Sequence, residues 1–122
     1  MSRDHRKLRA FQLADEFVLR IYGLTAQFPK DERFGLTSQM RRAAVSVAAN
    51  IVEGCARETQ KDYRHFCTIS FGSLRETGYF IDLASRLGYT NREDADACLA
   101  LYDETARVLS GLIRSLNQSS RS

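Results

Sequence analysis

The residues best suited to chemistry lie on one narrow stripe of a predicted helix over 36–58, which reads LTSQMRRAAVSVAANIVEGCARE. At about 100° per residue, its amide, hydroxyl, carboxylate and guanidinium groups fall on a single arc. The stripe consists of Gln39, Arg42, Ser46, Asn50, Glu53 and Arg57. Carboxylates, amides and arginines gathered in a cleft commonly bind polar ligands, so this polar stripe is the first candidate site.

The polar stripe also has predicted partners within the chain. A second helix over 60–87 follows a tight turn at Thr59, so residues equally distant from that turn should face each other. The facing pairs are Arg42 with Glu76, Ser46 with Gly72 and Ser73, and Glu53 with Arg64 or His65. The preferred interpretation is a satisfied polar network that fixes the register of the helical hairpin, and of subunits if there are several. The alternative is a groove or channel between copies that receives a small ligand.

No catalytic or metal-binding signature stands out. Ser46 and His65 could join a hydrolase triad only if folding brought them together, and the sequence has no nucleophile elbow. A carboxylate metal site in a helical bundle needs repeated Glu-x-x-His pairs, which are missing. Cys55, Cys67 and Cys98 form no C-x-x-C pair, and we expect buried free thiols. The sequence therefore predicts a protein that is not an enzyme and uses no metal or cofactor.

Basic side chains suggest a second candidate site, for RNA or DNA. They are Arg3, Arg6, Lys7 and Arg9 in an N-terminal arm, and Lys61, Arg64, Arg75 and Arg86 on the outward arc of the helix over 60–87. Aligned basic groups are typical of phosphate binding. The alternative is ordinary solvation, partly through local pairs such as Asp82 with Arg86. A net charge of +3 favours solvation in a monomer, whereas an oligomer would repeat the basic groups on one surface.

Four helices must position these residues. Apolar positions recur every three or four residues over 8–27, 36–58, 60–87 and 91–116. The connections are short, so the chain is predicted to be all-α, a single domain over 1–122 forming an antiparallel up-and-down four-helix bundle. Residues 1–7 are expected to form a loose arm, and the tail from Asn117 to be frayed.

The ends of the predicted helices carry recognisable signals. Phe28-Pro29 stops the first helix, because the residue before a proline avoids helical geometry. The expected caps are Thr37 or Ser38 for the second helix, Thr59 for the third, and Thr90 with Glu93 as a capping box for the fourth. Gly88 suits the left-handed position after the third helix. Phe34 and Leu36 are expected to close one end of the bundle.

The helix over 36–58 is apolar on both flanks of its polar stripe. One flank contains Leu36, Met40, Ala43, Ala44, Val47, Ile51 and Cys55, and the other Val45, Ala48, Ala49, Val52 and Ala56. A surface helix in a monomer normally has one apolar stripe. We therefore expect one flank to face the core and the other to face a second copy of the chain. The helix over 60–87 has a similar second arc, with Ile69, Phe80, Leu83 and Leu87.

Composition limits the remaining classes. The 122 residues are 43% hydrophobic and 27% charged, with a single Pro, as in an ordinary globular domain. No apolar run approaches the roughly 18 residues that span a bilayer, and the N-terminus lacks the apolar segment of a signal peptide. These features predict a cytoplasmic protein without a membrane partner.

Local signatures over 11–89 resemble those of a known bacterial family. They are Phe28-Pro29, Glu32, Leu36 through Gln39, Arg41-Arg42-Ala43, Ser46, Asn50-Ile51, Glu53-Gly54, Arg57, Phe66, Gly72-Ser73, Glu76 and Leu87-Gly88. The family comprises the four-helix-bundle proteins named for reading frames in intervening sequences of 23S ribosomal RNA genes. The chain departs from it in having no Trp near the start of the first helix.

The resemblance implies a left-handed bundle that assembles into a homopentameric ring, as in related accessory proteins of diversity-generating retroelements. Those relatives are basic on the outside and are thought to act through RNA and a reverse transcriptase. The implied role here is a non-enzymatic oligomer that binds or scaffolds RNA. The basic character of this chain is weaker than theirs, so a purely structural or protein-interaction role stays open.

Overall fold

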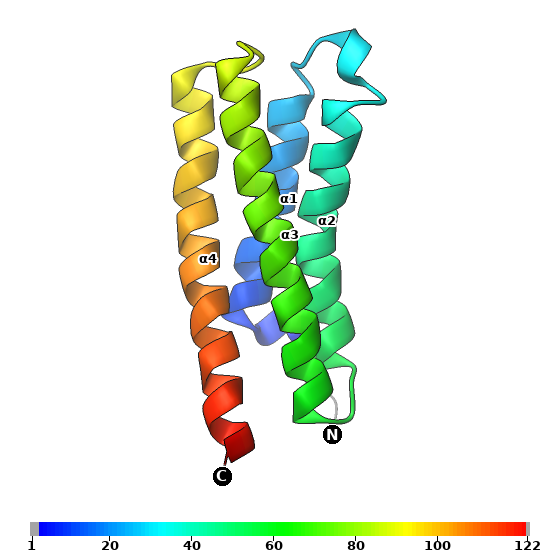
Figure 1. Cartoon of the computed structure of the whole chain (residues 1–122), viewed down its shortest axis with the longest axis vertical. Helices are drawn as coiled ribbons and strands as arrows, with labels where there is room; N and C mark the ends of the chain where they lie inside the picture. The colour runs from blue at the N-terminus through cyan, green and yellow to red at the C-terminus, as the bar shows by residue number, and fades with distance from the viewer. Residues whose placement is uncertain (1–2, 122) are drawn as a thin grey trace.

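The protein is a bundle of four helices. The computed structural model describes the backbone of residues 3–121 and the side chains of residues 3–117. The elements are η1 (His5–Lys7), α1 (Arg9–Thr25), η2 (Lys30–Glu32), α2 (Leu36–Cys55), α3 (Gln60–Arg86) and α4 (Arg92–Arg121), with no strand in the described backbone. Successive helices run antiparallel, and α1 also packs against α4, which closes the bundle (Figure 1). The predicted all-α antiparallel four-helix bundle is confirmed.

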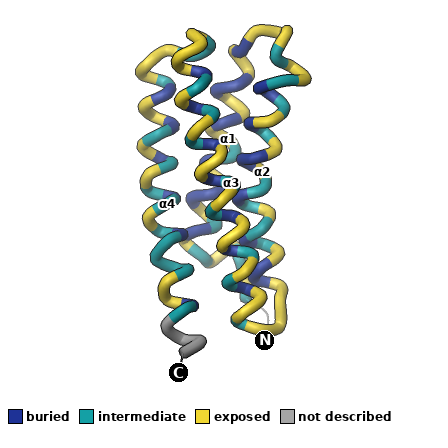
Figure 2. The backbone as a smooth tube through the Cα atoms, in the orientation of Figure 1, coloured by how far each residue is buried: buried dark blue, intermediate teal, exposed yellow. Residues whose placement is uncertain are grey.

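Every helix turns an apolar face to one shared core (Figure 2). Phe17 of α1, Met40 of α2 and Ile81 of α3 are completely buried. The thiols of Cys55, Cys67 and Cys98 are free and buried, as predicted. Burial raises the pKa of the Cys67 thiol to about 12, so this thiol stays protonated at neutral pH and is a poor nucleophile.

The ends of α2 and α4 differ most from those predicted. α2 ends at Cys55 rather than at 58, and the Arg57 amide then donates to the Gly54 carbonyl at 3.1 Å, a three-residue bond that tightens the last turn. α4 continues to Arg121 rather than ending at 116, so the backbone of the predicted frayed tail is helical as far as that residue. The side chains of 118–122 lie outside the described residues, as does the backbone of Ser122.

Only one of the three predicted N-terminal caps is formed as expected. Thr59 Oγ1 accepts a hydrogen bond from the Asp62 amide at 3.1 Å and caps α3, as predicted. The caps predicted for α2 and α4 were wrong. Neither Thr37 nor Ser38 caps α2, which begins at Leu36 with Gly35 at its N-cap and its first amide bonded to the Glu32 carboxylate. α4 is capped by Asn91 in place of Thr90. The Asn91 Oδ1 atom accepts from the Asp94 amide at 2.7 Å.

The N-terminal arm is docked in its described part rather than loose. The Arg3 amide donates to the Cys55 carbonyl at 3.3 Å, and Arg3 Nη1 donates to the Arg57 carbonyl at 3.0 Å. The Arg3 guanidinium also stacks 4.2 Å from the centre of the Tyr63 ring. The arm therefore covers the end of the bundle where α2 turns into α3. Its first residues, 1–2, lie outside the described part.

At the opposite end, Leu36 is buried as predicted, but Phe34 is not part of the closure. The Phe34 side chain is 87% exposed. Phe28 closes this end instead, with its ring centre 5.5 Å from that of Tyr89. The connection between α1 and α2 is held by Glu32, which accepts from the Tyr89 hydroxyl at 2.7 Å and from the Leu36 amide at 3.1 Å.

These two hydrogen bonds make the stability of the folded protein depend on pH. The hydrogen bond from Tyr89, followed by that from the Leu36 amide, lowers the pKa of Glu32 from its usual 4.5. The folded state then binds its proton less readily than the unfolded chain, so the stabilisation is present above pH 4.5 and is lost as pH falls through the lowered pKa. Glu32→Gln should therefore flatten the pH dependence of urea unfolding below about pH 5. Asp31→Asn is the control. It removes a neighbouring charge but leaves both hydrogen bonds of Glu32 in place, so the pH dependence of urea unfolding should remain that of the wild type.

Candidate functional site

The middle of the polar stripe forms a hydrogen-bonded network between α2 and α3. The hydroxyls of Ser46 and Ser73 are 2.9 Å apart, as their predicted register requires. Asn50 Nδ2 donates to the Ser46 carbonyl at 2.8 Å and to Ser46 Oγ at 2.9 Å. Beneath them the buried Ser70 hydroxyl donates to the Val47 carbonyl at 2.7 Å. These bonds fix how α2 and α3 lie against each other, which supports the predicted register-setting role.

One end of the stripe opens into a small hollow. The hollow measures about 290 Å³ and is lined by Gln39, Arg42, Ala43, Ser46, Ser73, Glu76 and Phe80. Arg42 and Glu76 are both exposed, and among the described residues no ion pair joins them. The predicted pairing between these two side chains is therefore not formed. Both charges remain available to a group from outside the chain.

The other end of the stripe is paired differently from the prediction. Glu53 forms its ion pair with Arg57, one turn further along the chain, and not with Arg64 or His65. The Arg57 guanidinium also lies 4.8 Å from the centre of the Phe66 ring. Arg64 instead donates to Asn117 Oδ1 at 2.8 Å and so links α3 to α4. The eight predicted network residues thus divide into a central network, a separate ion pair and an unpaired rim.

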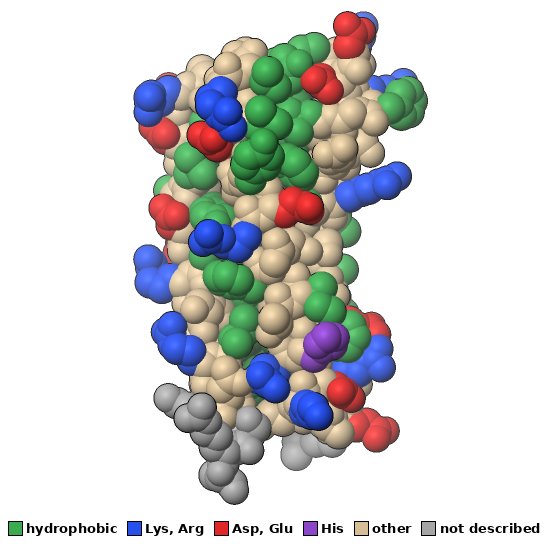
Figure 3. All heavy atoms as spheres, in the orientation of Figure 1, with side chains coloured by type: hydrophobic (Ala, Val, Ile, Leu, Met, Phe, Trp, Pro, Cys, Tyr) green, Lys and Arg blue, Asp and Glu red, His purple; other side chains and the backbone are tan. Residues whose placement is uncertain are grey.

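Exposed apolar side chains flank the stripe on both sides. On α2, Val45 is 41% exposed, Ala49 is exposed and Val52 is half-buried. Ile69 on α3 is 39% exposed, and Leu87, which directly follows α3, is 49% exposed. Figure 3 shows hydrophobic side chains gathered over the C-terminal half of α3. We call the polar stripe and its partners on α3, with Val45, Ala49, Val52, Ile69, Phe80, Leu83 and Leu87, the α2–α3 surface.

The described chain does not itself cover the α2–α3 surface. The second apolar flank of α2 is open in the single chain, which is what the prediction of a neighbouring copy requires of the monomer. The sequence pattern identified this flank because apolar residues on two sides of one helix exceed what a single core can cover. Whether a copy covers it stays a prediction.

The predicted basic site is not one continuous patch. Arg6 pairs with Asp4 at 3.0 Å, Arg9 with Glu104 at 2.7 Å, and Arg86 with Asp82 at 2.9 Å. Arg3 is docked on the turn between α2 and α3, and Arg64 is bonded to Asn117. Within the described side chains, this leaves Lys7, Lys61 and Arg75 exposed and without an ion pair.

Ser46 and His65 do not form a catalytic arrangement. The Ser46 hydroxyl is occupied by Ser73 and Asn50, while the His65 ring packs edge-on against Phe66 with centres 5.6 Å apart. Over the described residues, no three His, Cys, Asp or Glu side chains come together in a way that could hold a metal ion. In the same part of the chain, none of the helices combines the length and apolar character needed to cross a bilayer.

The fold and the α2–α3 surface define a helical-bundle protein whose polar stripe lies where its second helix meets the third. The chain belongs to the family of 23S rRNA-intervening sequence proteins, which matches residues 6–111. This confirms the resemblance noted in the sequence.

The fold is also that of a solved structure. It is a protein with unknown function from the S23 ribosomal protein family of Bacteroides thetaiotaomicron, with a TM-score of 0.80 and 24% identity over 86% of this chain and 95% of that chain. No curated protein matches the chain.

Proposed function

We propose that this protein is a non-enzymatic, cytoplasmic, self-assembling bundle whose α2–α3 surface packs against another copy of the chain. The resemblance to pentameric relatives favours a ring of five copies. The observation that carries the proposal is the strip of exposed apolar side chains beside unpaired polar groups on α2 and α3.

The composition of the α2–α3 surface supports an interface between proteins. Contiguous exposed apolar residues bordered by polar groups are typical of interaction sites. Interface centres are usually apolar and poor in charge, with polar groups toward the rim. Here Val45, Ile69 and Leu87 supply the apolar part, and Arg42 and Glu76 offer two unpaired charges. A partner could bury the first group and pair with the second.

The hollow beside Ser46 lies at the lower limit of the volumes that small-molecule sites have. Ligand pockets usually measure about 300–1,000 Å³ and enclose most of the ligand. The hollow beside Ser46 reaches only about 290 Å³. This volume is also sufficient for a side chain from a neighbouring copy.

Light scattering on the purified wild-type protein tests the proposal directly. At micromolar concentration we expect a molar mass of several copies, and of five if the resemblance holds. A monomer that persists at tens of micromolar would overturn the proposal. The measurement does not require that a ligand be known.

RNA or DNA binding is a second candidate function. Lys61 and Arg64, at the start of α3, lie near the turn on which Arg3 is docked. Several basic groups therefore gather at one end of the bundle, and a ring would repeat them around one face. Such repetition raises the local positive potential that attracts phosphates.

We expect Lys61→Gln combined with Arg75→Gln to weaken binding of a structured RNA and to flatten its salt dependence. Each lost phosphate contact should reduce the slope of log affinity against log salt by roughly 1. Arg6→Gln is the matched control, because Arg6 is already paired with Asp4 and should matter little. Filter binding over a salt series measures the affinity and its salt dependence for the wild type and for each variant. This candidate function would be contradicted if the wild type bound no RNA at low salt, or if its affinity did not change with salt concentration.

A further inference from the structure

A ring built from identical copies needs two different surfaces on each copy, because its contacts are head-to-tail. The α2–α3 surface supplies one of them, and its counterpart must lie elsewhere on the molecule. The inference below rests on the proposed self-assembly. It concerns a groove between α1 and α4 and an exposed phenylalanine on the loop that leads into α2.

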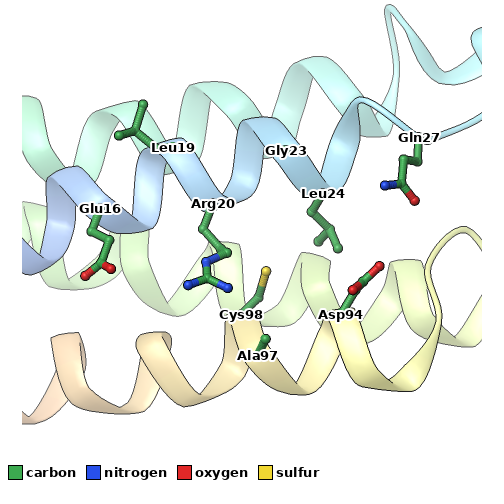
Figure 4. A pocket seen from close by; sticks show the side chains of 9 residues that line it. All are labelled: Glu16, Leu19, Arg20, Gly23, Leu24, Gln27, Asp94, Ala97 and Cys98. Atoms are coloured by element: carbon green, nitrogen blue, oxygen red, sulfur yellow. The ribbon is translucent and has the colours of Figure 1, made fainter.

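The α1–α4 groove has an apolar floor and an open wall. It measures about 470 Å³ and is lined by Glu16, Leu19, Arg20, Gly23, Leu24, Gln27, Asp94, Ala97 and Cys98 (Figure 4). Leu24 and Cys98 are buried and form the floor. The groove is open because Gly23 and Ala97 have little or no side chain, and a Cβ atom placed on Gly23 would meet nothing within 4 Å.

Three charged side chains border this groove. Glu16 and Arg20 lie one turn apart on α1, and Asp94 faces them from the first turn of α4 (Figure 4). None of the three side chains has a hydrogen bond or ion pair within the described part of the chain. The groove therefore presents an unpaired pattern of negative, positive and negative charge around an apolar floor.

The loop between α1 and α2 has the complementary character. Phe34 is 87% exposed, an unusual position for so large an apolar side chain. Lys30, Asp31 and Arg33 precede it and are exposed, and the Arg33 guanidinium lies 5.3 Å from the centre of the Phe34 ring. The loop thus presents an aromatic ring beside positive, negative and positive charge.

The Phe34 loop is also held in place. Glu32 accepts hydrogen bonds from the Tyr89 hydroxyl and from the Leu36 amide, which anchor the loop to the turn between α3 and α4 and to the start of α2. A loop that is already ordered loses little conformational entropy when it binds, which favours association. The backbone that carries Phe34 is therefore held in place before the loop meets a partner.

We propose that Phe34 of one copy inserts into the α1–α4 groove of the next copy. The groove is large enough, since a cavity of roughly 150 Å³ holds benzene. Each groove charge then finds an opposite charge: Lys30 and Arg33 face Glu16 and Asp94, and Asp31 faces Arg20. Both features lie at the end of the bundle where α1 ends and α4 begins (Figure 1), so the copies stand side by side at one level, as a closed ring requires.

Two substitutions test the contact without threatening the fold. Phe34→Ser removes the projection at an exposed position. Gly23→Leu fills the groove, and it has open space in its own chain and a higher helix propensity than glycine. Each should raise the dissociation constant of the assembly about 30-fold or more, as loss of a central aromatic contact does. Phe34→Leu and Gly23→Ala, which preserve the projection and the groove, are the matched controls.

Mixing the two variants gives the sharper test. The Gly23→Leu copy retains Phe34 but has a blocked groove, while the Phe34→Ser copy retains an open groove. In the mixture, Phe34 of the Gly23→Leu copy can enter the groove of the Phe34→Ser copy, but no third copy can be added by the same contact. Native mass spectrometry of the mixture should therefore find a one-to-one dimer that neither variant forms alone. If the wild type assembles but either variant keeps its mass, or the mixture gives no dimer, this contact is wrong while self-assembly stands. A monomeric wild type would defeat the proposed function itself.

Discussion

Glutamate in place of both Ile69 and Leu87 should dissociate the assembly into folded monomers. Ile69 lies on α3 and Leu87 directly follows that helix, both within the α2–α3 surface, and both side chains are partly exposed in the single chain. Exposed substitutions usually change the free energy of unfolding by no more than about 0.5 kcal/mol. At an interface, by contrast, an unpaired buried carboxylate costs several kcal/mol, so the dissociation constant should rise by roughly two orders of magnitude or more.

Thr68→Glu provides the matched control for this variant. Thr68 is exposed on the same helix, next to Ile69 in the chain, but it lies on the outward arc with Lys61 and Arg75. Light scattering over a concentration series gives the mass of each variant, and circular dichroism verifies that the helices persist. A double-glutamate variant with the wild-type mass would show that the α2–α3 surface faces solvent in the assembly.

The architecture could be predicted from the sequence because helix periodicity and short connections determine it together. The helix ends were harder, since several neighbouring residues could serve as caps. Thr90 and Asn91 both have suitable side chains, and the choice depends on the turn after α3. Gly88 adopts a left-handed φ of 77° there, and Asn91 rather than Thr90 is the residue whose side chain bonds an amide in the first turn of α4.

The side-chain pairing across α2 and α3 could be predicted only at the point of closest contact. Equal distance from the turn at Thr59 correctly placed Ser46 beside Ser73. The same rule placed Arg42 opposite Glu76, but register along the axis says nothing about lateral spacing. These two longer side chains stand at the rim of the hollow rather than between the helices. A helical wheel cannot distinguish those two positions.

The position of Phe34 could not be predicted at all. An apolar residue beside a turn ordinarily closes the end of a core, and the loop has no periodicity that would indicate otherwise. The structure uses Phe28 and Tyr89 for that closure, which leaves Phe34 outside. The α1–α4 groove was missed for a related reason. Gly23 lies on the exposed side of α1, where a Cβ would meet nothing within 4 Å, and a missing side chain gives no signal on a helical wheel.

Gly54→Val should destabilise the bundle by about 3 kcal/mol, in the upper part of the range for overpacked cores. Gly54 is buried near the end of α2, where that helix meets α3. A Cβ atom there would lie 3.1 Å from the Phe66 Cβ, 3.1 Å from the Tyr63 Cδ1 and 3.2 Å from the Tyr63 carbonyl oxygen. A carbonyl in the first turn of α3 cannot rotate away, so the two helices must separate.

Gly23→Ala is the contrasting control, because the added methyl meets nothing within 4 Å. It should stabilise the fold by up to about 1 kcal/mol through helix propensity alone. Urea unfolding should be measured in the Ile69→Glu, Leu87→Glu background, since association would otherwise contribute to stability. If Gly54→Val were as stable as its parent, the close approach of α2 and α3 could not be what sets their register. The Ser46–Ser73 and Ser70–Val47 hydrogen bonds would then carry that role without steric help.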